Sequence, residues 1–201
     1  MNSAYDVIVV GAGPAGIFTC YELTVLRPEA KVLLIDKGHD IFKRNCPILH
    51  KKIEKCPPPA GKKEYAGCLP ACSITNGFGG AGAYSDGKFN ITSEFGGWMT
   101  DYLPESKVVE LITYVDSINL KHGASETITD PTTDKVKEIE RRGYAVGLKL
   151  LRAKVRHLGT EQNLEILQSI YRYLSKRVDM AFQTEVDDIV TEREDNQFHV
   201  K

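Results

Sequence analysis

Short apolar runs alternate along the chain with longer amphipathic stretches, the pattern of a protein built from alternating strands and helices. Near the start, Val7–Val10 and Lys31–Ile35 are two runs rich in β-forming residues, and residues 15–26 between them can form a helix. The first of these runs, apolar throughout, predicts a strand covered on both faces, as in a parallel sheet. The start of the chain therefore predicts a strand–helix–strand unit.

Helical and strand patterns return in the second half of the chain. Amphipathic helices are predicted from Pro104 to about Lys121, from Asp134 through Arg142, and from Thr160 to about Lys176. Strands are predicted at Val178–Phe182, at Val186–Thr191 and from Phe198, whereas residues 148–159 fit either a helix or a strand. Because the last strand begins so close to the end of the sequence, we expect the chain to be the N-terminal piece of a longer protein.

The turn after the first strand carries a glycine pattern typical of dinucleotide sites. Gly11 permits the tight turn, Gly13 lets the backbone approach a pyrophosphate, and Gly16 lets the helix lie close to the strand. The N-terminus of that helix offers free N–H groups and a positive dipole end to phosphates. The second strand ends in Asp36, whose carboxylate is spaced to accept hydrogen bonds from an adenosine ribose. The alternative is a structural glycine turn in another kind of α/β protein.

Residues 39–102 show no clear period, and prolines exclude long helices or central strands from the first half of this stretch. Such a stretch indicates either disorder or a functional segment, and its cysteines favour the second. Four of them, Cys46, Cys56, Cys68 and Cys72, fall within 27 residues in the spacing C-x9-C-x11-C-x3-C. Structural disulfides are rare in the cytosol, but the spacing matches no standard zinc or ferredoxin pattern. A zinc or Fe–S site, a redox-active thiol pair and unconnected reduced cysteines all stay open.

A second glycine-rich segment follows the cysteines. Residues 77–87 contain five glycines and two alanines, which leaves the backbone uncovered for contact with a flat or phosphate-bearing ligand. Ser85, Asp86 and Lys88 would supply polar contacts to that ligand. Three aromatic residues in or next to the segment are unusual for a solvated linker, so they favour a ligand-binding loop over a flexible surface loop.

The composition is that of an ordinary globular protein, with 201 residues, a formal net charge of −1, 42% hydrophobic and 26% charged residues. No apolar run approaches the length of a membrane span or of a secretion signal, which makes a cytoplasmic location the default expectation. The near-neutral charge gives no reason to expect a nucleic-acid partner. A basic stretch at residues 37–65 either attracts an anionic ligand or forms a solvated surface.

Together these segments resemble the two-dinucleotide-binding-domain flavoproteins, the FAD-dependent oxidoreductases of the glutathione-reductase/fumarate-reductase superfamily. The opening motif from Val7 to Gly16, with Asp36, carries this likeness. A finer likeness is to the bacterial group of FAD-dependent dehydrogenases, or NAD(P)/FAD-dependent oxidoreductases. It rests on Cys68-x3-Cys72, on the segment from Gly77 to Lys88, and on Arg156-His157-Leu158-Gly159-Thr160.

The resemblance implies an α/β fold: a Rossmann-like FAD-binding domain with a parallel sheet, interrupted by the irregular Cys/Gly-rich stretch, and part of a helical and strand-containing substrate domain. Residues 1–102 and 160–201 would form the FAD-binding domain, incomplete at its C-terminus, and residues 103–159 the substrate-side segment. The residues implied to bind FAD are Gly11, Ala12, Gly13, Pro14, Ala15, Gly16, Asp36, Lys37, Gly79, Gly80, Ala81, Gly82, Ser85, Asp86, Gly87, Lys88 and Val186. Asp36 would bind the adenosine ribose, and the backbone of Val186 the adenine.

Two departures from the superfamily pattern stand out. Asp36 occupies a position that is usually glutamate, a longer acid. The later Ala-Thr-Gly-like turn and the C-terminal Gly-Asp motif, which complete the flavin site, are absent from the sequence. We therefore expect this chain on its own to bind FAD weakly or not at all.

The expected function is that of an FAD-dependent oxidoreductase, which transfers a hydride between the flavin and a small-molecule substrate, with NAD(P)H as a candidate partner. His157 is the leading candidate to face the substrate or the flavin because histidine titrates near neutrality, against a purely structural role. Two other functions stay open. One is a flavin/Fe–S electron-transfer protein that uses the cysteine cluster, and the other is a non-catalytic nucleotide-binding redox sensor.

Overall fold

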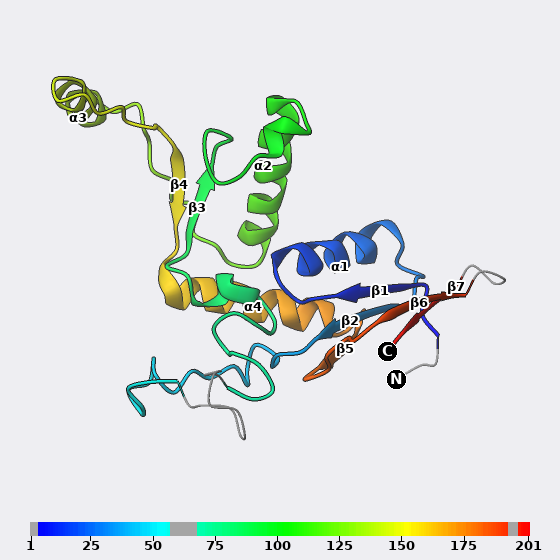
Figure 1. Ribbon diagram of the computed structural model, residues 1–201. Coiled ribbons are helices and arrows are strands. Elements are labelled where there is room, and N and C mark those ends of the chain that lie inside the picture. The colour runs from blue at the N-terminus through cyan, green and yellow to red at the C-terminus, as the bar shows by residue number, and fades with distance from the viewer. Residues whose placement is uncertain (1–3, 57–67, 193–196) are drawn as a thin grey trace. The chain divides into compact units, whose positions relative to one another are not determined.

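The computed structural model of the chain describes residues 4–56, 68–192 and 197–201 (Figure 1). The chain forms two compact units, one of Met1–Tyr84 with Leu167–Lys201 and the other of Ser85–Ile166. None of the helices in these described ranges is both long enough and apolar enough to cross a membrane.

The boundaries of the units differ from those expected from the sequence. Residues 85–102 and 160–166, expected in the dinucleotide-binding domain, belong to the second unit. For the first of these stretches the reason is a strand pairing. Strand β3 (Lys88–Ile91) forms an antiparallel ladder with β4 (Lys154–His157), and this ladder ties both strands into one unit.

The first unit is built on a parallel sheet in the order β1-β2-β5. Its strands are β1 (Val7–Val10), β2 (Val32–Asp36) and β5 (Asp179–Phe182), and helix α1 (Pro14–Leu26) connects the first two. The predicted strand–helix–strand unit is therefore confirmed. The burial expected for β1 is not observed, because β1 is half-buried and ends in an exposed Val10, whereas the first four residues of β2 are buried. β1 has a described neighbour on one side only, so less of the protein covers it.

Aromatic side chains fill the space between this sheet and the C-terminal half of helix α4 (Gly159–Leu174). The ring of Tyr171 lies 5.1 Å from that of Phe78 and 6.1 Å from that of Phe182. Phe78 is completely buried, as is Leu174 on the same helix as Tyr171. Burial of rings of this size is a large apolar contribution to stability, so these contacts fix the segment around Phe78 against the sheet.

The end of the chain forms a hairpin of β6 (Ile189–Glu192) and β7 (Gln197–Val200). The strand predicted at Val186–Thr191 thus begins three residues later than expected, and Val186 itself packs beside the buried cluster of Leu33, Ile35 and Ala181. Residues 193–196, between the two strands, lie outside the described residues.

The second unit combines the β3–β4 ladder with helices α2 (Glu105–Lys121) and α3 (Asp134–Tyr144). Both helices were predicted, and the ambiguous segment 148–159 contains β4. The Thr133 side chain caps α3 by accepting a hydrogen bond from the N–H of Val136. Each unit also contains a short 3-10 helix, Gly80–Tyr84 in the first and Met99–Asp101 in the second.

Candidate functional site

The loops that leave the parallel strands of the first unit meet at one edge of its sheet. The Gly11 N–H donates a hydrogen bond to the Ile35 carbonyl at 2.7 Å. Beyond β5, the Gln183 N–H donates to the Gly38 carbonyl at 2.8 Å, and the Thr184 N–H donates to the Asp36 carbonyl at 3.1 Å. Ligands of open α/β sheets bind at this carboxyl edge.

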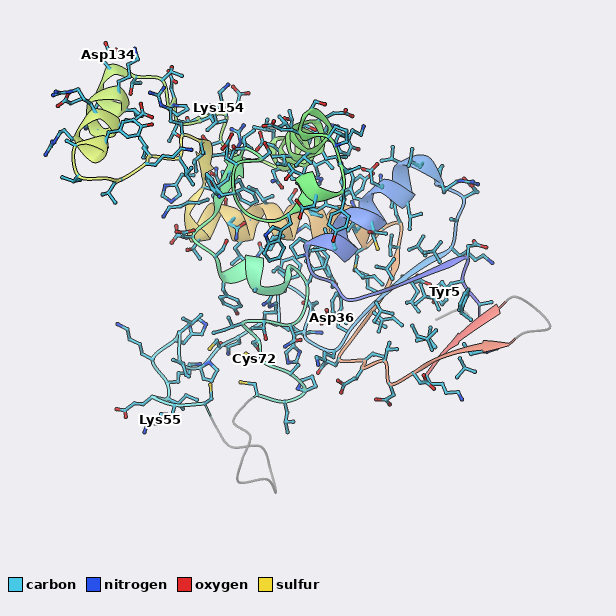
Figure 2. All side chains as sticks on the ribbon, turned by 45° about the horizontal axis from the view of Figure 1, so that its top comes forward. Tyr5, Asp36, Lys55, Cys72, Asp134 and Lys154 are labelled. Carbon is cyan, nitrogen blue, oxygen red and sulfur yellow. The ribbon has the colours of Figure 1, made fainter. Side chains whose placement is uncertain are left out.

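The Asp36 side chain, labelled in Figure 2, connects two of these loops, the turn after β1 and the long segment after β2. Its Oδ2 accepts a hydrogen bond from the Ala12 N–H at 2.8 Å, and its Oδ1 accepts from the N–H groups of Gly38 (2.7 Å) and Gly77 (2.8 Å). A carboxylate offers about four acceptor positions, so room for one hydroxyl is left on Oδ2. The sequence predicted a ribose contact here, which remains a prediction; the structure adds that Asp36 organises the loops.

The glycines of the first turn have different reasons to be glycine. A Cβ added at Gly16 would lie 1.9 Å from the Gly11 carbonyl oxygen, so the close helix–strand contact predicted from the sequence is present. Gly11 has a φ of +100°, which disfavours any larger residue. Gly13 has neither constraint, because its φ is −73° and no heavy atom other than those of its own residue and its two chain neighbours lies within 4 Å of the position that a Cβ would take.

The second glycine-rich segment begins against this turn. The Gly79 N–H donates to the Ala12 carbonyl at 2.8 Å. A Cβ at Gly80 would lie 3.2 Å from the Gly13 Cα, and one at Gly82 would lie 3.9 Å from the Pro14 ring. Residues 79–82, including the exposed Ala81, thus flank the first turn at the N-terminus of α1, beside the exposed Ala15.

The remaining residues of this segment belong to the second unit. Lys88 and Asp86 form an exposed ion pair at 2.8 Å, and the hydrogen bond from Lys88 lowers the pKa of Asp86. The Gly87 N–H donates to Ser85 Oγ at 3.2 Å. Gly87 is needed for packing, because a Cβ there would lie 2.6 Å from the Gly159 carbonyl oxygen.

Three further candidates from the sequence are exposed or peripheral. Lys37 forms a solvent-exposed ion pair with Glu185 at 3.3 Å, next to the loop after β5. Val186 is half-buried and packs against the cluster of Leu33, Ile35 and Ala181. His157 is an exposed residue of β4, opposite Lys88 in the ladder.

Arg44 is an important residue that the sequence did not reveal. It is buried, and its guanidinium donates to the carbonyls of Ser73 (3.0 and 2.7 Å), Ile74 (2.9 Å) and Phe78 (2.7 Å). It also lies over the Tyr84 ring, 5.0 Å from its centroid. Arg44 therefore holds the chain that leads into the second glycine-rich segment. Its position in a basic run, ordinarily a solvated surface, hid this role.

The cysteines are all free thiols, with Cys46 buried, Cys56 exposed, and Cys68 and Cys72 half-buried. Within the described ranges, no group of three or more His, Cys, Asp or Glu side chains is arranged to hold a metal ion. Residues 57–67, between the second and third of these cysteines, lie outside those ranges. The zinc and Fe–S interpretations therefore gain no support. The reactivity of each thiol depends on the groups that surround its sulfur atom.

Cys72 and Cys68 differ in the direction of their pKa shifts. Burial would raise the pKa of Cys72, but hydrogen bonds from the N–H groups of Ile74 and Thr75, from the Thr75 hydroxyl, and the charge of Arg44 outweigh it and lower the pKa. The pKa of Cys68 is raised by burial and by the neighbouring thiols of Cys72, Cys46 and Cys56.

We expect Cys72 to be alkylated by iodoacetamide faster than Cys68 near neutral pH. The lower pKa gives Cys72 the larger thiolate fraction, and the thiolate is the reacting form. Peptide mass spectrometry after timed quenching measures both rates. Cys20, whose pKa is raised to about 11 by burial, provides a slow reference in the same sample. A faster reaction at Cys68 would contradict this electrostatic description.

No family model matches the sequence, and no curated protein matches it. Among solved structures, the chain is similar to L-amino acid deaminase from Proteus vulgaris (14% identity, 96% of this chain and 43% of that chain, TM-score 0.46). It is also similar to 3-ketosteroid-Δ4-(5α)-dehydrogenase from Rhodococcus jostii RHA1 (11% identity, 98% and 43%, TM-score 0.48). A third is L-α-glycerophosphate oxidase from Mycoplasma pneumoniae with FAD bound (15% identity, 98% and 49%, TM-score 0.48). The chain spans less than half the length of each.

Proposed function

We propose that the first unit binds the ADP portion of FAD at the Gly11–Gly16 turn, and that the protein is an FAD-dependent oxidoreductase with a small-molecule substrate. The observation that carries the proposal is the open space at Gly13. The fold itself allows a larger residue there, since neither a positive φ nor a close neighbour requires glycine. A ligand that comes against the backbone at this point does require it.

The chemistry around this space suits a pyrophosphate. Helix α1 begins at Pro14 without a side-chain cap and without an acidic residue in its first turn, so its N-terminal end is free to attract an anion. Gly80 and Gly82 approach the turn with backbone rather than bulky side chains. Gly11, Gly13, Ala15 and Gly16 would hold the phosphates, with Gly80 beside them.

The remaining acceptor position on Asp36 suits one ribose hydroxyl. Its Oδ2 already accepts from the Ala12 N–H, which fixes the carboxylate beside the phosphate turn. An Asp36→Asn substitution would keep the side-chain size and remove one strong acceptor.

When bound, FAD supplies hydride transfer through its flavin ring, and this chain contributes binding and orientation of the nucleotide part. NAD(P)H as electron partner, and Val186 at the adenine, belong to the same proposal.

The test is a titration of the protein with FAD, followed by nuclear magnetic resonance, which resolves weak as well as tight binding. We expect amide shifts concentrated at residues 11–16, 36–38 and 77–82, and we expect ADP to compete. Parallel titrations with NAD+ and with riboflavin separate the alternatives. Tighter binding of NAD+ than of FAD would replace the flavoprotein with a nicotinamide-binding module, and absence of shifts with FAD would reject the proposal.

A further inference from the structure

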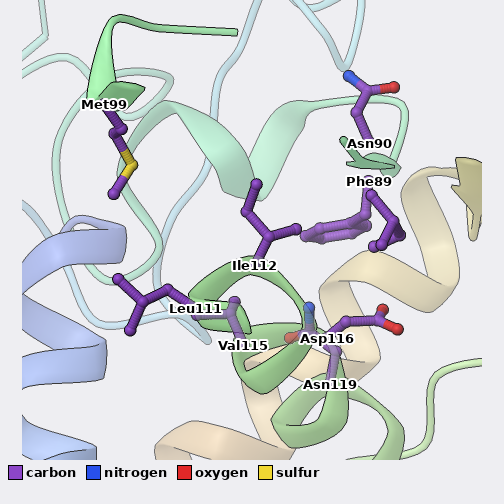
Figure 3. A pocket seen from close by; sticks show the side chains of 9 residues that line it. Phe89, Asn90, Met99, Leu111, Ile112, Val115, Asp116 and Asn119 are labelled. Atoms are coloured by element: carbon purple, nitrogen blue, oxygen red, sulfur yellow. The ribbon is translucent and has the colours of Figure 1, made fainter. Parts of the chain in front are cut away.

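We propose that the second unit binds a small, uncharged and mainly apolar ligand that carries one hydrogen-bond acceptor. The site is a pocket of about 270 Å³ between α2 and β3 (Figure 3). This inference goes beyond the proposed function and does not rest on flavin binding. The volume is close to the lower end of the range found for small-molecule pockets.

The walls of the pocket are mostly apolar. Side chains from β3, from the 3-10 helix at Met99 and from α2 contribute to it, namely Phe89, Ile91, Met99, Leu111, Ile112 and Val115. In Figure 3 the Ile112 side chain points a branch toward the Phe89 ring, and the Leu111 side chain extends on the side of Met99. Apolar walls of this kind favour a ligand whose surface is mainly hydrocarbon.

Asn119 provides one polar group at the base of the pocket. The residue is 3% exposed, and its amide Nδ2 is buried without a hydrogen-bond partner. Figure 3 shows this amide nitrogen pointing toward Ile112 and Phe89. A buried amide N–H without an acceptor is unfavourable, and native structures nearly always satisfy such groups. A ligand carbonyl or ether oxygen in the pocket would satisfy it.

The charges around the pocket exclude an anionic ligand. Asp116 also lines the wall, and both its oxygens accept from Arg156 at 2.7 Å. The same guanidinium donates to the Ser125 carbonyl, so each of its three nitrogens already has a hydrogen-bond partner. No lysine or arginine is among the described residues that line the pocket. A carboxylate would therefore be buried near Asp116 without a counter-ion, which is costly.

The geometry thus favours a neutral ketone-like compound with a ring or short alkyl body. Acetophenone is a suitable probe because it places one carbonyl on an aromatic ring. α-Methylstyrene is its matched control, since a CH2 group replaces the carbonyl oxygen in almost the same shape. Benzoate is the charged control.

The experiment measures binding of these three probes to the protein by nuclear magnetic resonance titration. We expect acetophenone to bind about tenfold tighter than α-methylstyrene, the ratio expected for one hydrogen bond to a buried donor, and to shift the Asn119 side-chain NH2 signals. Benzoate should bind most weakly. Equal affinities for acetophenone and α-methylstyrene would overturn the role of Asn119, and no binding of either would overturn the site.

Two substitutions locate the probe. Asn119→Leu keeps a similar volume and removes the donor, so the preference for acetophenone over α-methylstyrene should disappear. Val115→Phe fills the pocket and should abolish binding of both. Thr113→Ala, on an exposed position of the same helix, should leave all affinities unchanged. Unchanged acetophenone binding in Val115→Phe would place the probe elsewhere and overturn the proposal. The Asn119 side-chain signals of the unmodified protein provide a second readout that needs no variant.

Discussion

Replacing Gly16 with alanine is expected to destabilise the first unit by about 1–3 kcal/mol, the usual cost of inserting a methyl group where there is no room. The added Cβ would meet the Gly11 carbonyl oxygen at 1.9 Å and the Val9 side chain at 3.3 Å. Backbone atoms cannot rotate away, so α1 must shift from β1. Alanine is the better helix former by about 1 kcal/mol, which offsets part of this loss.

Denaturant unfolding of the two proteins measures the difference directly. The matched control is Gly13→Ala, which adds the same methyl group three residues earlier, where no heavy atom beyond the adjacent residues lies within 4 Å. Alanine is a poorer N-cap than glycine, so the control should lose about 1 kcal/mol or less. Equal stability of Gly16→Ala and the unmodified protein would show that helix and strand do not pack as described.

Removing the carboxylate of Asp116 is expected to cost about 3–5 kcal/mol, because it leaves the Arg156 charge buried without a partner. The two side chains are 10% and 6% exposed, and the guanidinium meets the carboxylate with two hydrogen bonds of 2.7 Å. The hydrogen bonds that Arg156 donates to Asp116 raise the pKa of Arg156 in the unmodified protein. A guanidinium keeps its proton in proteins, so Arg156 cannot avoid the cost in the variant by becoming neutral.

The variants Asp116→Leu, Arg156→Met and the double variant test this account by denaturant unfolding. The double variant should recover much of the stability lost in Asp116→Leu, since an apolar pair replaces the ion pair without an unpaired charge. Glu110→Ala provides a control on the same helix. Its exposed pair with Lys107 should contribute little. A small loss in Asp116→Leu, similar to that control, would contradict the buried character of the pair.

The sequence predicted those helices and strands that form from a local pattern of apolar and polar residues. The strand–helix–strand start and the helix after Pro104 followed from local periodicity, and both are present. β3 was missed because four residues after a glycine-rich segment carry no readable period. It forms because β4, more than sixty residues later, supplies its partner. Such a pairing is a property of the tertiary fold.

The candidate site was predicted in outline, and its supporting contacts were not. Gly79 and Gly80 lie against the first turn, so the two glycine-rich segments, each implied to bind FAD, are in contact, and FAD binding there remains a prediction. Arg44 was hidden because its role depends on carbonyls about 30 residues away. Asn119 could not be identified from the sequence, because an asparagine in a helix is common. Its interest comes from the burial of its amide nitrogen without a hydrogen-bond partner, which only the structure shows.

The proposed function requires a nucleotide pyrophosphate to lie against Gly13. The most direct measurement is the dissociation constant for FAD of Gly13→Ala beside that of the unmodified protein, with Thr19→Ala, at an exposed position of the same helix, as the control. We predict a dissociation constant at least about tenfold higher for Gly13→Ala, because the methyl group occupies the ligand's place, and no change for Thr19→Ala. An unchanged affinity in a folded Gly13→Ala protein would contradict the account.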